Sequence, residues 1–272
     1  MAKVRAGQGW HWVGQALGMA RKYPGIFPVM GLIVSAIALV PLLGGLAIAI
    51  LGPALVAGSV IATRDATAGR KPQIGQLFQL FAEQRAGGGI ALCLPVILSQ
   101  IVAGMVLVGA VSARLTRAGV DLKSLESNPS ELMQNLTQYI GPGFLGWIIV
   151  AVIIALIGYA FAALAIPRVG LDRKPAMQAM AESFRTVRRH WGAWLLTGLA
   201  LFLCMFIPVV VFYVLGSSLI AQFVANAVLY TLLGPTLYFA YSDLYGGPDA
   251  ATDDHGTAPD ASAPPPPPSF EA

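Results

Sequence analysis

The strongest polar side chains inside the apolar stretches of this chain are amides, at Gln100, Gln222 and Asn226. Amides at such positions either hydrogen-bond between neighbouring helices or line a path for a polar substrate. The same stretches contain no Asp, Glu, Lys or Arg, although ion-coupled carriers ordinarily place a carboxylate there. The residues leave two interpretations open, helix-to-helix hydrogen bonding and a cavity lining, and they disfavour an ion-coupled carrier.

Residue types that catalyse reactions or bind metals are few and scattered. The three histidines share no ligand spacing, the two cysteines lie in apolar runs, and no G-x-S-x-G or phosphate-binding glycine loop occurs. Asp65 and Asp243 each follow a span containing Leu-Gly-Pro, and we expect them to pair with nearby arginines at helix ends. We therefore expect no catalytic residue, no metal and no cofactor, and we predict that the protein is not an enzyme.

Helices in a bilayer must position these side chains, because the composition excludes an ordinary soluble domain. Of 272 residues, 56% are hydrophobic and 11% are charged, with a mean hydropathy of +0.70. Soluble domains carry about 25% charged residues. We predict an all-α membrane protein whose six transmembrane helices form three hairpins, at about 24–41, 44–63, 89–111, 144–166, 192–215 and 218–241.

The first predicted hairpin is the shortest. The 41 residues between Lys22 and Arg64 carry no charge, and as one helix they would be about 60 Å long, twice the roughly 30 Å hydrocarbon core. The run must fold back, and Pro41 to Gly45 is the natural break. Both halves are near the lower length limit, so the sequence leaves open whether this hairpin spans fully or is re-entrant.

Cations are concentrated in alternate connections. Segments 1–23, 64–88 and 167–191 hold 14 of the 17 lysines and arginines. Since cationic loops stay in the cytoplasm, we predict a multi-pass protein of the bacterial inner (plasma) membrane with both termini cytoplasmic.

A cytoplasmic amphipathic helix is predicted before each hairpin, in 9–23, 74–85 and 175–191, where apolar residues recur at helical spacing. Cations beside Trp and Phe at span ends favour anionic phospholipid over nucleic acid as the partner. The residues expected to anchor the chain at the lipid surface are Arg21, Lys22, Arg185, Arg188, Arg189 and Trp191.

Two further segments differ from the spans. Residues 121–139 predict a short helix on the outer surface. We predict a transmembrane domain over 1–243 and a disordered, proline-rich cytoplasmic tail over 244–272, which offers a docking segment to a protein partner. A homo-oligomer is left open.

Related phrases predict an internal repeat. RKYPGIFPVMGL at 21–32 aligns with RRHWGAWLLTGL at 188–199, and LGPAL at 51–55 returns as LGPTL at 233–237. The order of amphipathic helix, cations and hairpin is also shared, so we predict a duplication with the middle hairpin as a divergent third copy.

The N-terminal part resembles a known group. GQGWHWVGQALGMARKYPGIF, VPLLGG and ATRDATAGRKPQIGQLFQLF, within about 8–85, are similar to an uncharacterised family of bacterial multi-span inner-membrane proteins. The hairpin repeat is more loosely similar to the membrane domain attached to some glycerophosphodiester phosphodiesterases. The resemblance implies an inner-membrane protein, and it carries over no catalytic residues because the soluble phosphodiesterase barrel is missing here.

Two functional hypotheses follow. The first is a non-enzymatic scaffold or membrane-organising protein of unknown biochemical activity. The alternative is a small permease or lipid-translocating protein that uses a groove between the repeats, with Gln100, Gln222 and Asn226 as candidate lining residues.

Overall fold

The fold is known from a computed structural model, which describes residue 5 and residues 7–41, 43–117 and 144–246. This part of the chain is helical and contains no strand, as predicted. The predicted surface helix at 121–139 and nearly all of the predicted tail lie outside the described residues. The helices are α1 (Gln8–Lys22), α2 (Phe27–Ala38), α3 (Leu43–Thr67), the 3-10 helix η1 (Ile74–Phe78), α4 (Gln79–Ala82), α5 (Ala86–Ala91), α6 (Cys93–Arg117), α9 (Phe144–Ala162), α10 (Ala165–Gly170), α11 (Ala176–Arg189), α12 (Trp191–Val214) and α13 (Ser218–Tyr245).

Five helical stretches are long and apolar enough to cross a membrane. They match five of the six predicted spans, and each extends past at least one predicted boundary. In chain order they are Leu43–Thr67, Ala86–Arg117, Phe144–Gly170, Trp191–Val214 and Ser218–Tyr245.

The span predicted at 24–41 is the exception, because α2 has only 12 residues. Such a helix is about 18 Å long, well short of a hydrocarbon core of roughly 30 Å. Turns limit it at both ends, one at Pro24 and Gly25 and the other from Leu39 to Pro41. Proline and glycine favour turns, and the charge-free run therefore contains one long helix instead of two spans.

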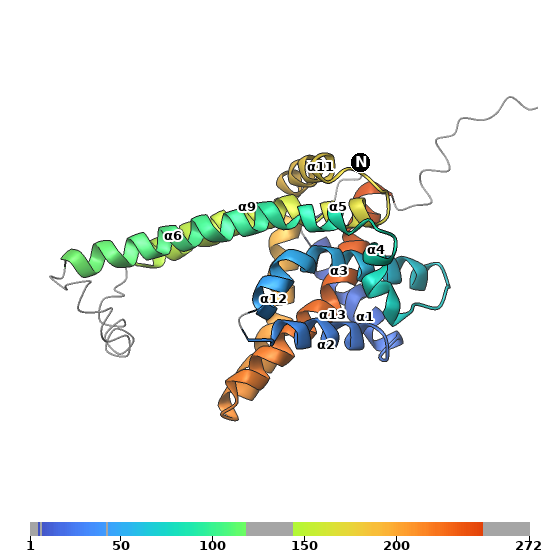
Figure 1. Cartoon of the computed structure of the whole chain (residues 1–272), viewed down its shortest axis with the longest axis horizontal. Coiled ribbons are helices and arrows are strands. Elements are labelled where there is room, and N and C mark those ends of the chain that lie inside the picture. Colours follow the sequence, from blue (N-terminus) through green and yellow to red (C-terminus); the bar gives the residue numbers. More distant parts are fainter. Residues whose placement is uncertain (1–4, 6, 42, 118–143, 247–272) are drawn as a thin grey trace, which may run out of the picture.

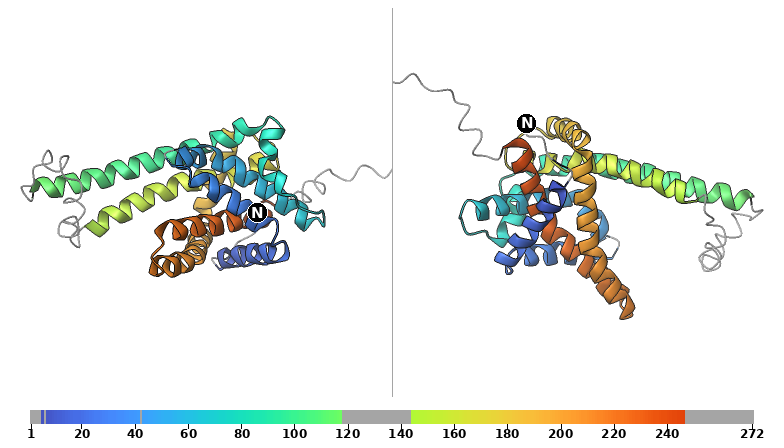
Figure 2. Two further views of the ribbon diagram at one scale, coloured as in Figure 1. Left: turned by 60° about the horizontal axis from the view of Figure 1, so that its bottom comes forward. Right: turned by 180° about the vertical axis from the view of Figure 1, so that it is seen from behind.

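The long helices pack in consecutive pairs. α6 packs along α9, α12 packs along α13, and α2 packs against both α3 and α13. The α6/α9 pair extends as a long arm away from the other helices (Figures 1 and 2). Small residues allow close packing within this arm, since a Cβ on Gly158 of α9 would overlap Ser99 of α6.

The amphipathic segments dock on other helices. α1 packs on α12 and α13, η1 and α4 pack on α3, and α11 packs on α9 and α10. Their apolar residues are therefore buried against protein, among them Trp12 of α1, Leu80 of α4 and Met180 of α11. The helix predicted over 74–85 is broken into η1 and α4 and ends before Gln84, whose φ is +56°.

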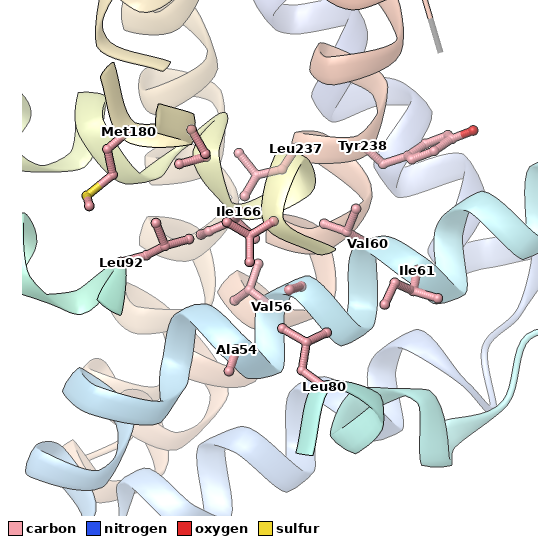
Figure 3. Close-up of a cluster of buried hydrophobic side chains, with 14 residues drawn as sticks. Ala54, Val56, Val60, Ile61, Leu80, Leu92, Ile166, Met180, Leu237 and Tyr238 are labelled. Carbon is pink, nitrogen blue, oxygen red and sulfur yellow. The ribbon is translucent and has the colours of Figure 1, made fainter. Parts of the chain in front are cut away.

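One hydrophobic cluster joins these parts. It contains side chains of α3, α10, α11 and α13, with Leu80 of α4 and Leu92 beside them (Figure 3). Val60, Ile166 and Leu237 face one another there. The ends of α3, α10 and α13 are thereby held together at one end of the molecule.

Candidate functional site

Many charged side chains of the described residues gather where α3, α10 and α13 end. We call this region, together with α11 that docks on it through Glu182, the cationic end, because Arg64, Arg70, Arg85, Arg168 and Lys174 lie there. Three of the hydrogen-bonded clusters there each tie one of the three helix ends to an amphipathic segment.

Asp65, near the end of α3, forms the first cluster. Its carboxylate accepts hydrogen bonds from Arg70 Nη2 at 2.6 Å, Arg64 Nη2 at 3.1 Å and Gln76 Nε2 at 2.6 Å. The pairing with arginine agrees with the prediction. Because Gln76 belongs to η1, the carboxylate also fastens η1 to α3.

Arg168 of α10 forms the second cluster, and its side chain is only 13% exposed. It donates to Glu182 of α11 and, at 2.9 Å, to Asp172, and its guanidinium lies 4.3 Å from the ring centroid of Tyr245. Lys174 Nζ adds a second cation 3.0 Å from Glu182. Burial alone would raise the pKa of Glu182, but the hydrogen bonds and charges of both cations outweigh it and lower that pKa.

Asp243 of α13 forms the third cluster, with α1. Its Oδ2 accepts hydrogen bonds from Trp12 Nε1 at 2.7 Å and Gln8 Nε2 at 2.9 Å. The prediction of an arginine partner for Asp243 is wrong, because α1 brings a buried indole to this position instead.

The predicted lipid anchors lie on the surface. Arg21 and Lys22 are exposed at the end of α1, and α11 exposes three arginines beyond its docked face. Trp191, at the start of α12, is 65% exposed. The structure thus groups Arg185, Arg188 and Arg189 on α11, next to Trp191, and places Arg21 and Lys22 on a separate helix.

The predicted cavity-lining residues lie on two helices. Gln100 is exposed on α6, and its Nε2 lies 3.4 Å from the hydroxyl of Tyr159 on α9. Gln222 is exposed and Asn226 half-buried on α13. The spacing of four residues places these two on one face of α13, and Tyr230 continues that face. The sequence analysis did not identify Tyr159 or Tyr230, although the four-residue spacing from Gln222 through Asn226 to Tyr230 is visible in the sequence.

A shallow polar depression lies beside η1. Asp65, Arg70, Lys71, Gln73, Gln76 and Gln79 are among its lining residues. Because it mixes a bonded carboxylate with cations, it presents little net charge to a ligand. No group of three or more His, Cys, Asp or Glu side chains in the described ranges is arranged to hold a metal ion.

Comparisons with protein-family models, curated proteins and solved structures find no match to this chain. The family resemblance drawn from the sequence therefore stays a prediction, and the function is argued from the residues and their arrangement.

Proposed function

We propose that this chain is a non-enzymatic integral membrane protein that acts as a scaffold and gathers anionic phospholipid at its cationic end. The observation that carries the proposal is the group of exposed cations on α11, Arg185, Arg188 and Arg189, beside the exposed Trp191 that begins an apolar helix. Indole rings favour the level of the lipid headgroups, where phosphates meet the cations.

Docking of the amphipathic segments supports a scaffold with a defined surface. The apolar face of α11 is buried, and Glu182 fastens the helix to Arg168. The exposed arginines therefore project from a held helix instead of a loose one. Each cation near an anionic surface contributes about 1 kcal/mol of attraction, so three on one helix favour anionic over neutral lipid substantially.

The proposal includes location and orientation. The five long apolar helices suit a multi-pass protein, and 14 of the 17 lysines and arginines fall in three alternate segments of the chain. This distribution favours a bacterial inner membrane with the cationic end in the cytoplasm.

The test uses the full chain in nanodiscs that contain phosphatidylcholine alone or phosphatidylcholine with 30% phosphatidylglycerol. We expect the anionic lipid to raise the thermal unfolding midpoint of the wild type. The triple variant R185Q/R188Q/R189Q should lose about half of this rise or more, because it removes about 3 kcal/mol of attraction.

The matched control is R114Q/R117Q, which removes cations from the far end of α6 and should keep most of the rise. A wild type that responds equally to both lipid mixtures would overturn the proposal. So would a triple variant with an unchanged response.

A further inference from the structure

Uncharged polar side chains lie along two of the long apolar helix pairs. Gln100 and Tyr159 belong to the α6/α9 arm, and α13 carries the others on one face. We call these five residues the polar row: Gln100, Tyr159, Tyr230, Asn226 and Gln222.

Both parts of the row begin near one hydrophobic cluster. Tyr230 packs against the same hydrophobic cluster as Phe161, which follows Tyr159 by two residues, and the Tyr230 hydroxyl reaches α3 beside Gly52. From Tyr230 the row follows α13 through Asn226 to Gln222, which lies four residues from the first residue of that helix. Eight residues of α-helix give this part a length of about 12 Å. The row therefore leads from the level of Gly52 toward the end of α13 that lies opposite the cationic end.

The hydrogen-bonding capacity of the row is largely unused. Among the described residues, the side chains of Gln222 and Asn226 make no hydrogen bond, and the contact between Gln100 and Tyr159 is long at 3.4 Å. Gln100 and Gln222 are exposed, and Tyr159 is 51% exposed. Amides facing hydrocarbon without a partner are costly, so such a face favours contact with a polar group that enters the bilayer.

We propose that the polar row binds the headgroup and glycerol region of a phospholipid inside the bilayer and shortens the apolar path between leaflets by about 12 Å, so that the protein translocates phospholipid. Amide and phenol groups both donate and accept, which suits phosphate, ester and hydroxyl oxygens of any headgroup. Large apolar side chains are exposed on the neighbouring helices, for example Ile153 on α9 and Phe202 on α12, and they suit acyl chains. No charge lies in the row, so passage is passive and runs in both directions.

This activity is independent of anionic-lipid binding at the cationic end. The row binds through neutral groups, and none of its five residues belongs to α11, which carries Arg185, Arg188 and Arg189. Loss of the anionic-lipid response with translocation intact would therefore remove the scaffold proposal and leave this one standing.

The experiment reconstitutes the full chain into liposomes that carry phosphatidylcholine with a fluorescent headgroup label in both leaflets. Dithionite, which does not cross the bilayer, then bleaches only the outer leaflet. We expect wild-type vesicles to lose the protected half of the signal as well. The triple variant Q100L/Q222L/N226L should slow this second phase about tenfold or more, because it removes every amide of the row.

Two further variants test whether the effect is specific to the row. Q178L removes an exposed glutamine of α11, outside the row, and should translocate like the wild type. The double variant Y159F/Y230F removes only two hydroxyl groups and should slow the second phase by a smaller factor. Wild-type vesicles that bleach no further than protein-free vesicles would overturn the proposal, as would a triple variant as fast as the wild type.

A second measurement identifies the occupant. A benzophenone amino acid in place of Gln222, activated by light in intact membranes, should form adducts with phospholipid. Adducts with a protein in place of lipid would show that the row is a helix-docking face and would overturn the proposal.

Discussion

At single residues, the absence of a side chain decides where helices meet. A Cβ on Gly9 of α1 would overlap the carbonyl of Ala193 and crowd Thr197 of α12. A Cβ on Gly58 of α3 would overlap the carbonyls of Gln76 and Leu77 in η1. Backbone therefore packs directly on backbone at these two docking sites, and a single added methyl group has no room.

We predict different effects of the same substitution at two positions of α1. Gly9→Ala should destabilise the protein by about 1–3 kcal/mol, because the methyl group forces α1 away from α12. Gly14→Ala should be neutral or stabilise by up to about 1 kcal/mol, because its Cβ meets open space and alanine favours helix. Thermal unfolding of both purified variants measures the difference. Equal midpoints would contradict the close contact at Gly9.

At the scale of elements, α11 and α1 are docked by different interactions. Ion pairs hold α11, whereas neutral donors of α1 bond to a carboxylate. The carboxylate of Glu182 is held by Arg168 and Lys174, whereas α1 is held at Asp243 by an indole and an amide. Docking of α11 should therefore respond to pH through Glu182, whose pKa is lowered from the ordinary value of 4.5.

The sign follows from linkage. Since the folded state lowers the pKa of Glu182, the pair contributes its full stability above about pH 4.5 and loses it as the pH falls through the lower, folded pKa. Glu182→Gln should cost about 2 kcal/mol at pH 7, because it leaves Arg168 with one carboxylate fewer. The gap between wild type and variant should shrink toward pH 3, measured by chemical unfolding between pH 7 and pH 3.

Arg185→Gln serves as the control on the same helix. Arg185 is exposed on α11, and its loss should leave the pH dependence of stability unchanged. A gap between wild type and Glu182→Gln that stays constant down to pH 3 would mean that Glu182 does not stabilise the docked helix as an anion.

At the scale of the whole molecule, the cationic end and the tip of the α6/α9 arm are far apart. α6 has 25 residues and is therefore about 37 Å long, more than the roughly 30 Å of hydrocarbon. The arm points away from the core that gathers the ends of α3, α10 and α13 (Figure 1). A bilayer that contains the arm would place its two ends on opposite faces.

We predict the labelling pattern of single cysteines in a background without Cys93 and Cys204. Lys71→Cys and Gln178→Cys should react with a charged, membrane-impermeant maleimide only after the cells are opened. Arg117→Cys should react in intact spheroplasts, because it lies at the other end of α6. Permeabilised cells should label all three and serve as the control. Reaction of Lys71→Cys and Gln178→Cys from opposite sides would refute a shared cationic end.

Several features of this protein were predictable from local composition. Five of the six apolar runs form helices of membrane-spanning length, and 175–191 contains an amphipathic helix whose exposed arginines were correctly assigned. Helix formation and amphipathicity depend on neighbours three and four residues apart, so the linear pattern contains them. The short length of α2 was harder to predict. The run around Pro41 is apolar throughout, and hydropathy alone does not show where a helix begins or ends.

Sequence by itself determined the helical class, the segregation of cations and the uncharged character of the polar residues in the apolar runs. Only the tertiary structure decided what the amphipathic faces cover, which partner Asp243 has and which side chains complete the polar row. Trp12 and Asp243 are 231 positions apart, and Gln100 and Tyr159 are 59 positions apart. Contacts of that kind depend on how whole helices pack, and the packing energy is shared among many residues, so no local pattern encodes them.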